Sequence, residues 1–147
     1  MSITAILAAA LVISVMGLVF GALLGVTGRV FAVPSNPTVV ALREWKHNSA
    51  ERQVIMARIC DRICEEYGLI PVFLPMHEPL DNKINKKVQS LCRCESVFLT
   101  GITGSEMLGI LRRMEFVATM RLHTLIYSTA VGTPSIGLAY DGKLRAF

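Results

Sequence analysis

Apolar and polar positions divide the chain into two parts with different patterns. Residues 3–28 form one uninterrupted apolar stretch, and residues 1–28 carry no charged side chain. From residue 38 onward, short apolar runs alternate with segments in which apolar residues recur every three or four positions. Runs without alternation are typical of strands buried on both faces, and the longer period is typical of amphipathic helices. The pattern therefore predicts an apolar anchor followed by a domain of alternating strands and helices.

This second part is predicted to be an α/β, Rossmann-like parallel sheet with helices on both faces. The expected strands are 38–42, 70–74, 97–100, 116–119 and 135–139. The residues expected to start helices are Asn48 with Glu51, Asp81, and Thr103 with Glu106. The residues expected to end them are Gly68 and Gly132. The predicted inward-facing residues of the first two helices are Met56, Ile59, Cys60, Ile63 and Tyr67, then Ile84, Val88 and Leu91.

The apolar stretch is long enough for a transmembrane helix, since a helix needs about 20 apolar residues to cross a bilayer. A secretory signal peptide is the alternative, but it would begin with a basic region and have a shorter apolar core. Arg29, Arg43 and Lys46 follow the stretch and nothing basic precedes it. The positive-inside rule then predicts a single-pass protein of the inner membrane with a cytoplasmic C-terminal domain. The expected domains are a transmembrane helix at 1–28, a linker at 29–37 and the α/β domain at 38–147.

Three glycines in the apolar stretch share one helix face. Gly17, Gly21 and Gly25 recur every four residues. Such spacing lets a second transmembrane helix approach closely, which predicts helix–helix association. Glycine is also simply frequent in membrane helices, and the spacing does not separate these two interpretations.

Charge and cysteine content narrow the class of function. The net charge of +4 is mild, and no basic run is interleaved with aromatic residues, so nucleic acid is not an expected partner. The four cysteines, Cys60, Cys64, Cys92 and Cys94, lack the consistently spaced pairs of a typical zinc site. We therefore expect structural thiols in a reducing cytoplasm, with zinc or a metal cluster as the alternative.

Candidate chemistry collects in the turns that follow the strands. The carboxyl ends of parallel strands lie at one edge of a sheet, so these turns converge. Arg121 and His123 lie two residues apart where a strand passes into a helix. Free N–H groups and the positive end of the helix dipole attract anions there, which predicts a phosphate or carboxylate site. The other polar or aromatic residues of these turns are Arg43, Trp45, His77, Tyr140 and Lys143.

Each of these residues also has a structural interpretation. Arg43 can pair with a surface carboxylate, Trp45 can cover the core, and His77 can be an ordinary exposed loop histidine. His123 can cap its helix. The turn 101–104 is expected to be a plain strand–helix connection, because it lacks the Lys-Ser of a phosphate-binding Walker loop.

Four sequence blocks resemble the polysaccharide pyruvyl transferase family. They are VALREW at 40–45, VFLPMH at 72–77 followed by Asp81, RLHTLI at 121–126 and GLAYDGK at 137–143. The RLH block followed by Tyr-Asp-x-Lys is the most specific of them. The resemblance covers residues 38–147 and implies the second half of a glycosyltransferase-B-like architecture of two Rossmann-type halves. We therefore expect a partial form of that architecture.

The resemblance also implies a reaction. Family members transfer the enolpyruvyl unit of phosphoenolpyruvate to two sugar hydroxyls, giving a pyruvate ketal and phosphate. The family's positions match Arg43, Arg121 and His123, with His123 expected as general acid or as a group stabilising the leaving phosphate. Tyr140 and Lys143 are expected to contact the substrate. The expected partners are phosphoenolpyruvate, a polysaccharide or lipid-linked sugar acceptor and the membrane, and the scheme requires no metal or cofactor.

A shorter block resembles a second family. VFGALLG at 19–25 and RVFAV at 29–33 are similar to the membrane anchor of the B subunit of the Rnf electron-transport complex. The spacing of the four cysteines differs from that subunit's iron–sulfur motifs. The alternatives to a transferase are therefore a membrane-anchored electron-transport component, or a non-catalytic fusion or fragment joined near Pro34–Pro37.

Overall fold

A computed structural model describes residues 33–44 and 49–139, which form a five-stranded parallel sheet with helices between the strands. The strands follow one another across the sheet in the order β3-β2-β1-β4-β5, and all four pairings are parallel. This confirms the predicted α/β fold. The strand bounds are β1 (Pro37–Ala41), β2 (Ile70–Phe73), β3 (Val97–Phe98), β4 (Phe116–Thr119) and β5 (Ser135–Gly137).

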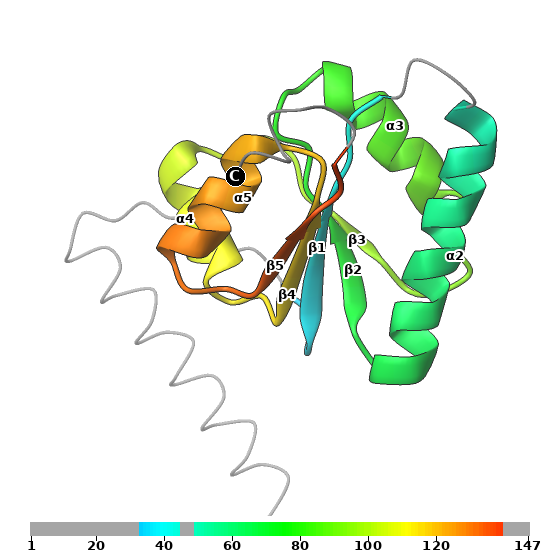
Figure 1. Cartoon of the computed structure of the whole chain (residues 1–147), viewed down its shortest axis with the longest axis horizontal. Helices are drawn as coiled ribbons and strands as arrows, with labels where there is room; N and C mark the ends of the chain where they lie inside the picture. The colour runs from blue at the N-terminus through cyan, green and yellow to red at the C-terminus, as the bar shows by residue number, and fades with distance from the viewer. Residues whose placement is uncertain (1–32, 45–48, 140–147) are drawn as a thin grey trace, which may run out of the picture. The chain divides into compact units, whose positions relative to one another are not determined.

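Four helices cover the two faces of the sheet. The helices α2 and α3 pack together on one face, and α4 and α5 pack together on the other (Figure 1). The chain moves outward from β1 to β3, then returns to place β4 on the other side of β1. The order therefore reverses between β1 and β4, as in doubly wound folds. The helix bounds are α2 (Ser49–Tyr67), α3 (Leu80–Gln89), α4 (Gly104–Leu111) and α5 (Leu122–Ala130).

The core lies between the sheet and its helices. All five residues of β1 are buried, and none of the five strands in the described part of the chain contains a charged residue. A strand covered on both faces needs apolar residues at every position, which explains the continuous apolar runs in the sequence. The buried cluster includes Val40, Leu42, Met56, Cys60, Phe73, Ile84, Val88 and Met120.

Several predicted helix boundaries are confirmed. The side chain of Thr103 accepts the N–H of Glu106, and the Glu106 carboxylate accepts the N–H of Thr103, which forms the capping box of α4. Gly68 ends α2 in the left-handed conformation, with φ of 64°, and Gly132 follows α5 with φ of 77°. Glycine suits both positions because it has no Cβ. The predicted cap Asn48 lies outside the described residues.

The buried face of α2 was predicted only in part, since Met56 and Cys60 are buried as expected but other predicted residues are not. The side chains of Ile59 and Tyr67 are 41% and 70% exposed, whereas Asp61 is buried. The helix is turned so that Met56, Ala57, Cys60 and Asp61 face inward. A search for apolar periodicity assigns an aspartate to the solvent, but hydrogen bonds from a distant turn satisfy this carboxylate inside the fold.

The region around α3 also differs from the prediction. Asp81 does not cap this helix, because the N-cap is Pro79 and Asp81 lies in the first turn. Leu91 lies beyond the end of α3 and is exposed, since the chain has already turned away from the sheet. The predicted strand 97–100 contains only two paired residues, Val97 and Phe98, at the edge of the sheet.

The predicted transmembrane helix, with Gly17, Gly21 and Gly25, lies outside the described residues and stays a prediction. The same holds for the predicted boundary between anchor and linker. Within residues 33–44 and 49–139, no helix has both the length and the hydropathy that a membrane span requires.

Candidate functional site

The reversal of strand order brings two predicted site segments together. β1 and β4 are neighbours, and Ala41 lies opposite Thr119. Arg43 follows Ala41 by two residues, and Arg121 follows Thr119 by two residues, so both lie at the carboxyl edge of the same strand pair. The chain leaves β1 for one face of the sheet and β4 for the other. In open α/β sheets this switch point is where ligands bind.

The remaining predicted residues are distributed differently. His123 lies exposed in the first turn of α5, at the same edge as Arg121, and Arg43 is also exposed. His77 is exposed in the turn after β2. Trp45, Tyr140 and Lys143 lie outside the described residues, so their placement in the site stays a prediction.

Arg121 is held by a buried carboxylate. Its Nε donates to Asp81 Oδ2 at 2.9 Å, and its Nη2 donates to the other carboxylate oxygen. The Asp81 side chain is 1% exposed and that of Arg121 is 20% exposed. Such two-point pairing fixes the plane of the guanidinium. The pair therefore orients Arg121, and it leaves Nη1 outside the contact with Asp81.

The first turns of α3 also connect to the other segments at this edge. Asn85, which is fully buried, donates its side-chain NH₂ to the backbone oxygens of Leu42 at 3.0 Å and of Asp81 at 2.7 Å. Its Oδ1 accepts the N–H of Leu42 at 3.1 Å. One amide side chain thus satisfies both backbone polar groups of Leu42, the residue that follows β1. This contact positions the chain just before Arg43.

Two further bonds shape the turns. The N–H of Arg121 donates to Thr119 Oγ1 at 2.9 Å, which fixes the passage from β4 into α5. The N–H of Gly101 donates to Glu78 Oε1 at 2.6 Å and joins the turns after β2 and β3. The turn 101–104 leads directly into the capping box of α4, which agrees with its interpretation as a plain connection.

The N-termini of the two helices on this face differ in a way that bears on anion binding. The N-terminus of α4 is closed by its own capping box, in which Thr103 and Glu106 occupy the first N–H groups. The N-cap of α5 is Arg121, and no side-chain cap hydrogen bond is made at this helix start among the described residues. An uncapped helix start keeps backbone N–H groups for a ligand and has the positive end of the helix dipole. The predicted cap role of His123 is wrong, because His123 lies inside the helix.

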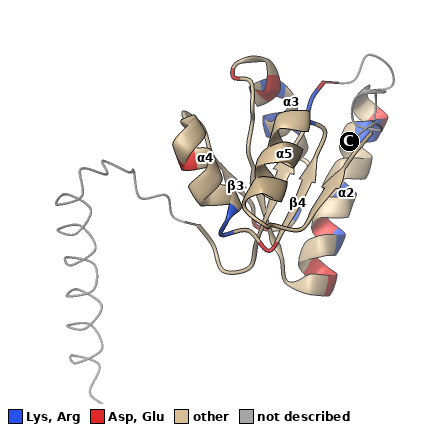
Figure 2. Ribbon diagram, turned by 60° about the vertical axis from the view of Figure 1, so that its left-hand side comes forward, with Lys and Arg blue, Asp and Glu red and all other residues tan. Residues whose placement is uncertain are grey.

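Sequence reasoning named Arg43, Arg121 and His123 as site residues but did not single out Asn85, and it assigned Asp81 to a helix cap. A signal was present, because residues 81 and 85 lie one turn apart beside the apolar positions 84 and 88. Figure 2 shows charged residues on the helices and connecting turns, while the strands are free of them. Asp81 and Asp61 are charged residues on inward helix faces, and Asp81 is the one that lies at this site.

Comparison with known proteins supports the family. A model of the family described as polysaccharide pyruvyl transferase matches residues 19–142, which is most of the chain. The matched span includes Arg43, Arg121, His123 and Tyr140 and ends one residue before Lys143. No curated protein and no solved structure matches the chain. The span begins inside the apolar stretch, and the resemblance to the Rnf anchor finds no support. The chain belongs to the polysaccharide pyruvyl transferase family.

Proposed function

We propose that this domain binds phosphoenolpyruvate at the carboxyl edge of β1 and β4 and transfers its pyruvyl unit to a cell-surface polysaccharide. The observation that carries the proposal is that Arg43 and Arg121 each follow one of two neighbouring strands at the strand-order reversal, and that α5 begins there without a side-chain cap among the described residues. Family membership supports the transferase class. The choice of donor rests on the match between these groups and the two anionic ends of phosphoenolpyruvate.

The donor offers a phosphate and a carboxylate to two kinds of binding group. A phosphate suits the uncapped start of α5, where backbone N–H groups and the helix dipole favour a dianion. A carboxylate suits a guanidinium, and Arg43 lies across the strand pair from that helix. Arg121 adjoins the helix start, and its fixed orientation lowers the ordering cost of binding. In this arrangement Arg43 and Arg121 bind opposite ends of one small molecule.

We assign His123 to proton transfer. A proton is added to the methylene carbon of phosphoenolpyruvate, and a sugar hydroxyl attacks the adjacent carbon. A second hydroxyl then attacks the same carbon and phosphate leaves, which gives a ketal. Of the two hydroxyl protons, one balances the proton gained by the new methyl group and the other leaves with the phosphate. A histidine suits this step because its ordinary pKa lies near neutral pH. His123 lies in the first turn of α5, beside the proposed phosphate position.

The proposal extends to the acceptor and the membrane. An anchor at residues 3–28 would hold the domain at the cytoplasmic face of the inner membrane, where a lipid-linked sugar is within reach. The doubly wound sheet would supply one wall of a glycosyltransferase-B-like cleft, and a second Rossmann-type unit would supply the other. Tyr140 and Lys143 are proposed for the rim of the donor site.

The test is a phosphoenolpyruvate titration followed by thermal unfolding, because a ligand that binds only the native state raises its apparent stability. The full chain should be stabilised by phosphoenolpyruvate, and Arg43→Ala and His123→Ala should reduce the stabilisation. The matched control is Arg113→Ala, since Arg113 is exposed in the connection that enters β4 from the opposite edge. Equal stabilisation of all three variants and the parent chain would overturn the site assignment.

A further inference from the structure

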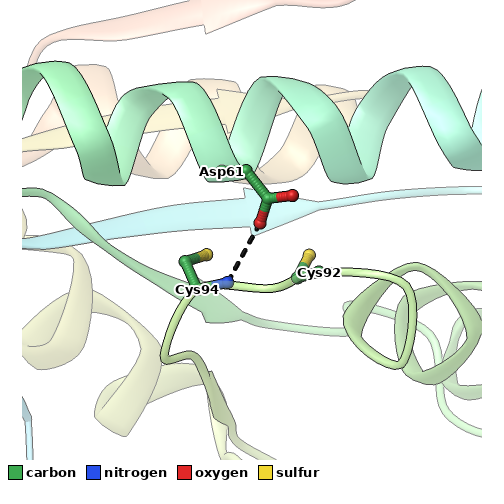
Figure 3. A group of neighbouring side chains, drawn as sticks. All are labelled: Asp61, Cys92 and Cys94. Atoms are coloured by element: carbon green, nitrogen blue, oxygen red, sulfur yellow. Dashed lines mark hydrogen bonds between the residues drawn. The ribbon is translucent and has the colours of Figure 1, made fainter.

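The fold brings the two cysteine pairs of the sequence together. Cys60 and Cys64 lie one turn apart on α2, whereas Cys92 and Cys94 lie in the connection between α3 and β3. Figure 3 shows the sulfur atoms of Cys92 and Cys94 directed toward α2 and the carboxylate of Asp61. One ligand atom from each of Asp61, Cys92 and Cys94 lies within 4.8 Å of the other two. Asp61 lies far from Cys92 and Cys94 in the sequence, and the cysteine spacing did not predict that they come together.

Hydrogen bonds from Asp61 hold the connection between α3 and β3 against α2. Asp61 Oδ1 accepts the N–H of Arg93 at 2.7 Å and the N–H of Cys94 at 3.0 Å. Asp61 Oδ2 lies 3.3 Å from Nε of Arg93, whose side chain is 80% exposed. These bonds hold the backbone of the C-x-C segment while both of its sulfur atoms face the same carboxylate. These hydrogen bonds therefore preorganise the ligand atoms for an ion.

The two cysteines of the C-x-C segment also adjoin the core. Cys92 and Cys94 pack against the buried cluster that contains Cys60, and the Cys92 thiol donates to the backbone oxygen of Val88 at 3.3 Å. The thiolate is the form of a cysteine that binds metal, and a dication deprotonates thiols as they coordinate.

We propose that Asp61, Cys92 and Cys94 bind a divalent cation of the zinc class, with Cys60 as the fourth ligand. Thiolate sulfur and a carboxylate oxygen are ligands that Zn²⁺ accepts in a tetrahedral site. At a Zn–S length near 2.3 Å, two tetrahedral sulfur ligands lie about 3.8 Å apart. The ligand atoms of Asp61, Cys92 and Cys94 lie within 4.8 Å of one another, so closure around the ion needs a contraction on the order of 1 Å. Side-chain rotation supplies a movement of this size.

The surroundings fit a structural ion. Three thiolates and one carboxylate around a dication leave a net negative charge, and the guanidinium groups of Arg58 and Arg93 line a hollow next to Asp61. The ion would join α2 to the connection that precedes β3. That connection has no regular structure, and β3 pairs through only two residues. A metal at this position would therefore stabilise the least supported edge of the sheet, independently of pyruvyl transfer.

The experiment measures zinc bound to the full chain, purified in detergent under reducing conditions and equilibrated with one equivalent of Zn²⁺. The parent chain should bind one ion, and Cys92→Ser and Cys94→Ser should each weaken binding by at least about tenfold. The matched control is Cys64→Ser, because Cys64 lies one turn from Cys60 on the same helix but belongs neither to the group of three ligands nor to the buried cluster that contains Cys60. This control should keep the ion. Retention of zinc by the Cys92 and Cys94 variants would overturn the proposal, as would its loss from the Cys64 variant.

A second measurement needs no variant and so does not depend on variant folding. Co²⁺ replaces Zn²⁺ in thiolate sites and then shows intense visible absorption from tetrahedral coordination, with a sulfur-to-cobalt band in the near ultraviolet. Co²⁺ added to the parent chain should produce both features, and an equivalent of Zn²⁺ should abolish them. A spectrum identical to that of free Co²⁺ would overturn the proposal.

Discussion

The pair between Asp81 and Arg121 offers the sharpest test of how this fold positions its site. Replacing Asp81 with Asn keeps the shape of the side chain but removes the charge opposite the guanidinium. Removing one partner of a buried ion pair costs about 3–5 kcal/mol. The Arg121 side chain is 20% exposed, so water can partly solvate its charge when Asp81 is replaced. We therefore expect Asp81→Asn to lower the free energy of unfolding by about 3 kcal/mol, at the low end of that range.

Replacing Arg121, the other member of the pair, should lower the free energy of unfolding by more. Arg121→Gln leaves the Asp81 carboxylate charged at 1% exposure, with the backbone N–H of His77 at 3.0 Å as a remaining donor. A charge that cannot reach water carries the larger desolvation penalty, so we expect a loss of about 4 kcal/mol. The double variant Asp81→Asn with Arg121→Gln leaves no buried charge. It should be destabilised by about 2 kcal/mol less than the sum of the two single variants, a coupling within the usual range for residues in contact.

The measurement is urea unfolding of the full chain in detergent at neutral pH, followed by far-ultraviolet circular dichroism. The slope of the free energy against urea should be unchanged among the four proteins, which shows that the substitutions act on stability alone. If the single effects add to within about 0.5 kcal/mol, the two side chains do not interact in the folded protein. That result would refute the role of Asp81 in orienting Arg121.

Three further predictions concern the Asn85 side chain, the cap of α4 and the proposed metal site. Asn85→Ala leaves the buried N–H and oxygen of Leu42 without partners and should cost about 3 kcal/mol in urea unfolding. Its control is Asn82→Ala, expected to cost less than about 1 kcal/mol, because Asn82 Oδ1 has no hydrogen-bond partner among the described residues. Thr103→Ala removes the cap of α4 and should cost about 1 kcal/mol by the same assay; an unchanged midpoint would contradict the capping box. Chelation of zinc should lower the thermal midpoint of the parent chain but not that of Cys92→Ser, and equal shifts would count against the metal site.

The sheet could be predicted from the sequence because its strands are buried on both faces. Residues 116–119 were expected as a strand and form β4 with the same bounds. A run of apolar residues at consecutive positions is a local signal, and it can be recognised without knowing which strands lie beside it. Strand ends were less exact, since 97–100 pairs only at Val97 and Phe98. Those ends depend on neighbours that a local pattern does not contain.

The buried polar contacts could not be predicted in the same way. Asn85 meets Leu42 across 43 positions of sequence, and Asp61 meets Arg93 across 32. Helix periodicity shows that each polar residue lies beside an apolar face, but it does not show which distant backbone satisfies it. The cysteines illustrate the same point, because Cys60 on α2 and the C-x-C segment after α3 come together only when α2 and α3 pack against each other.

The first turns of α3 and the residues before them connect three of the turns at the carboxyl edge of the sheet. Glu78 binds the turn after β3, Asp81 binds Arg121 after β4, and Asn85 binds the end of β1. Because one rigid segment holds three turns, the spacing between Arg43 and Arg121 is set by hydrogen bonds behind the site. A substitution at Asn85 should therefore weaken binding of phosphoenolpyruvate even though Asn85 is fully buried. Binding affinity measured at a temperature where the Asn85→Ala variant is fully folded separates this positioning effect from the loss of stability.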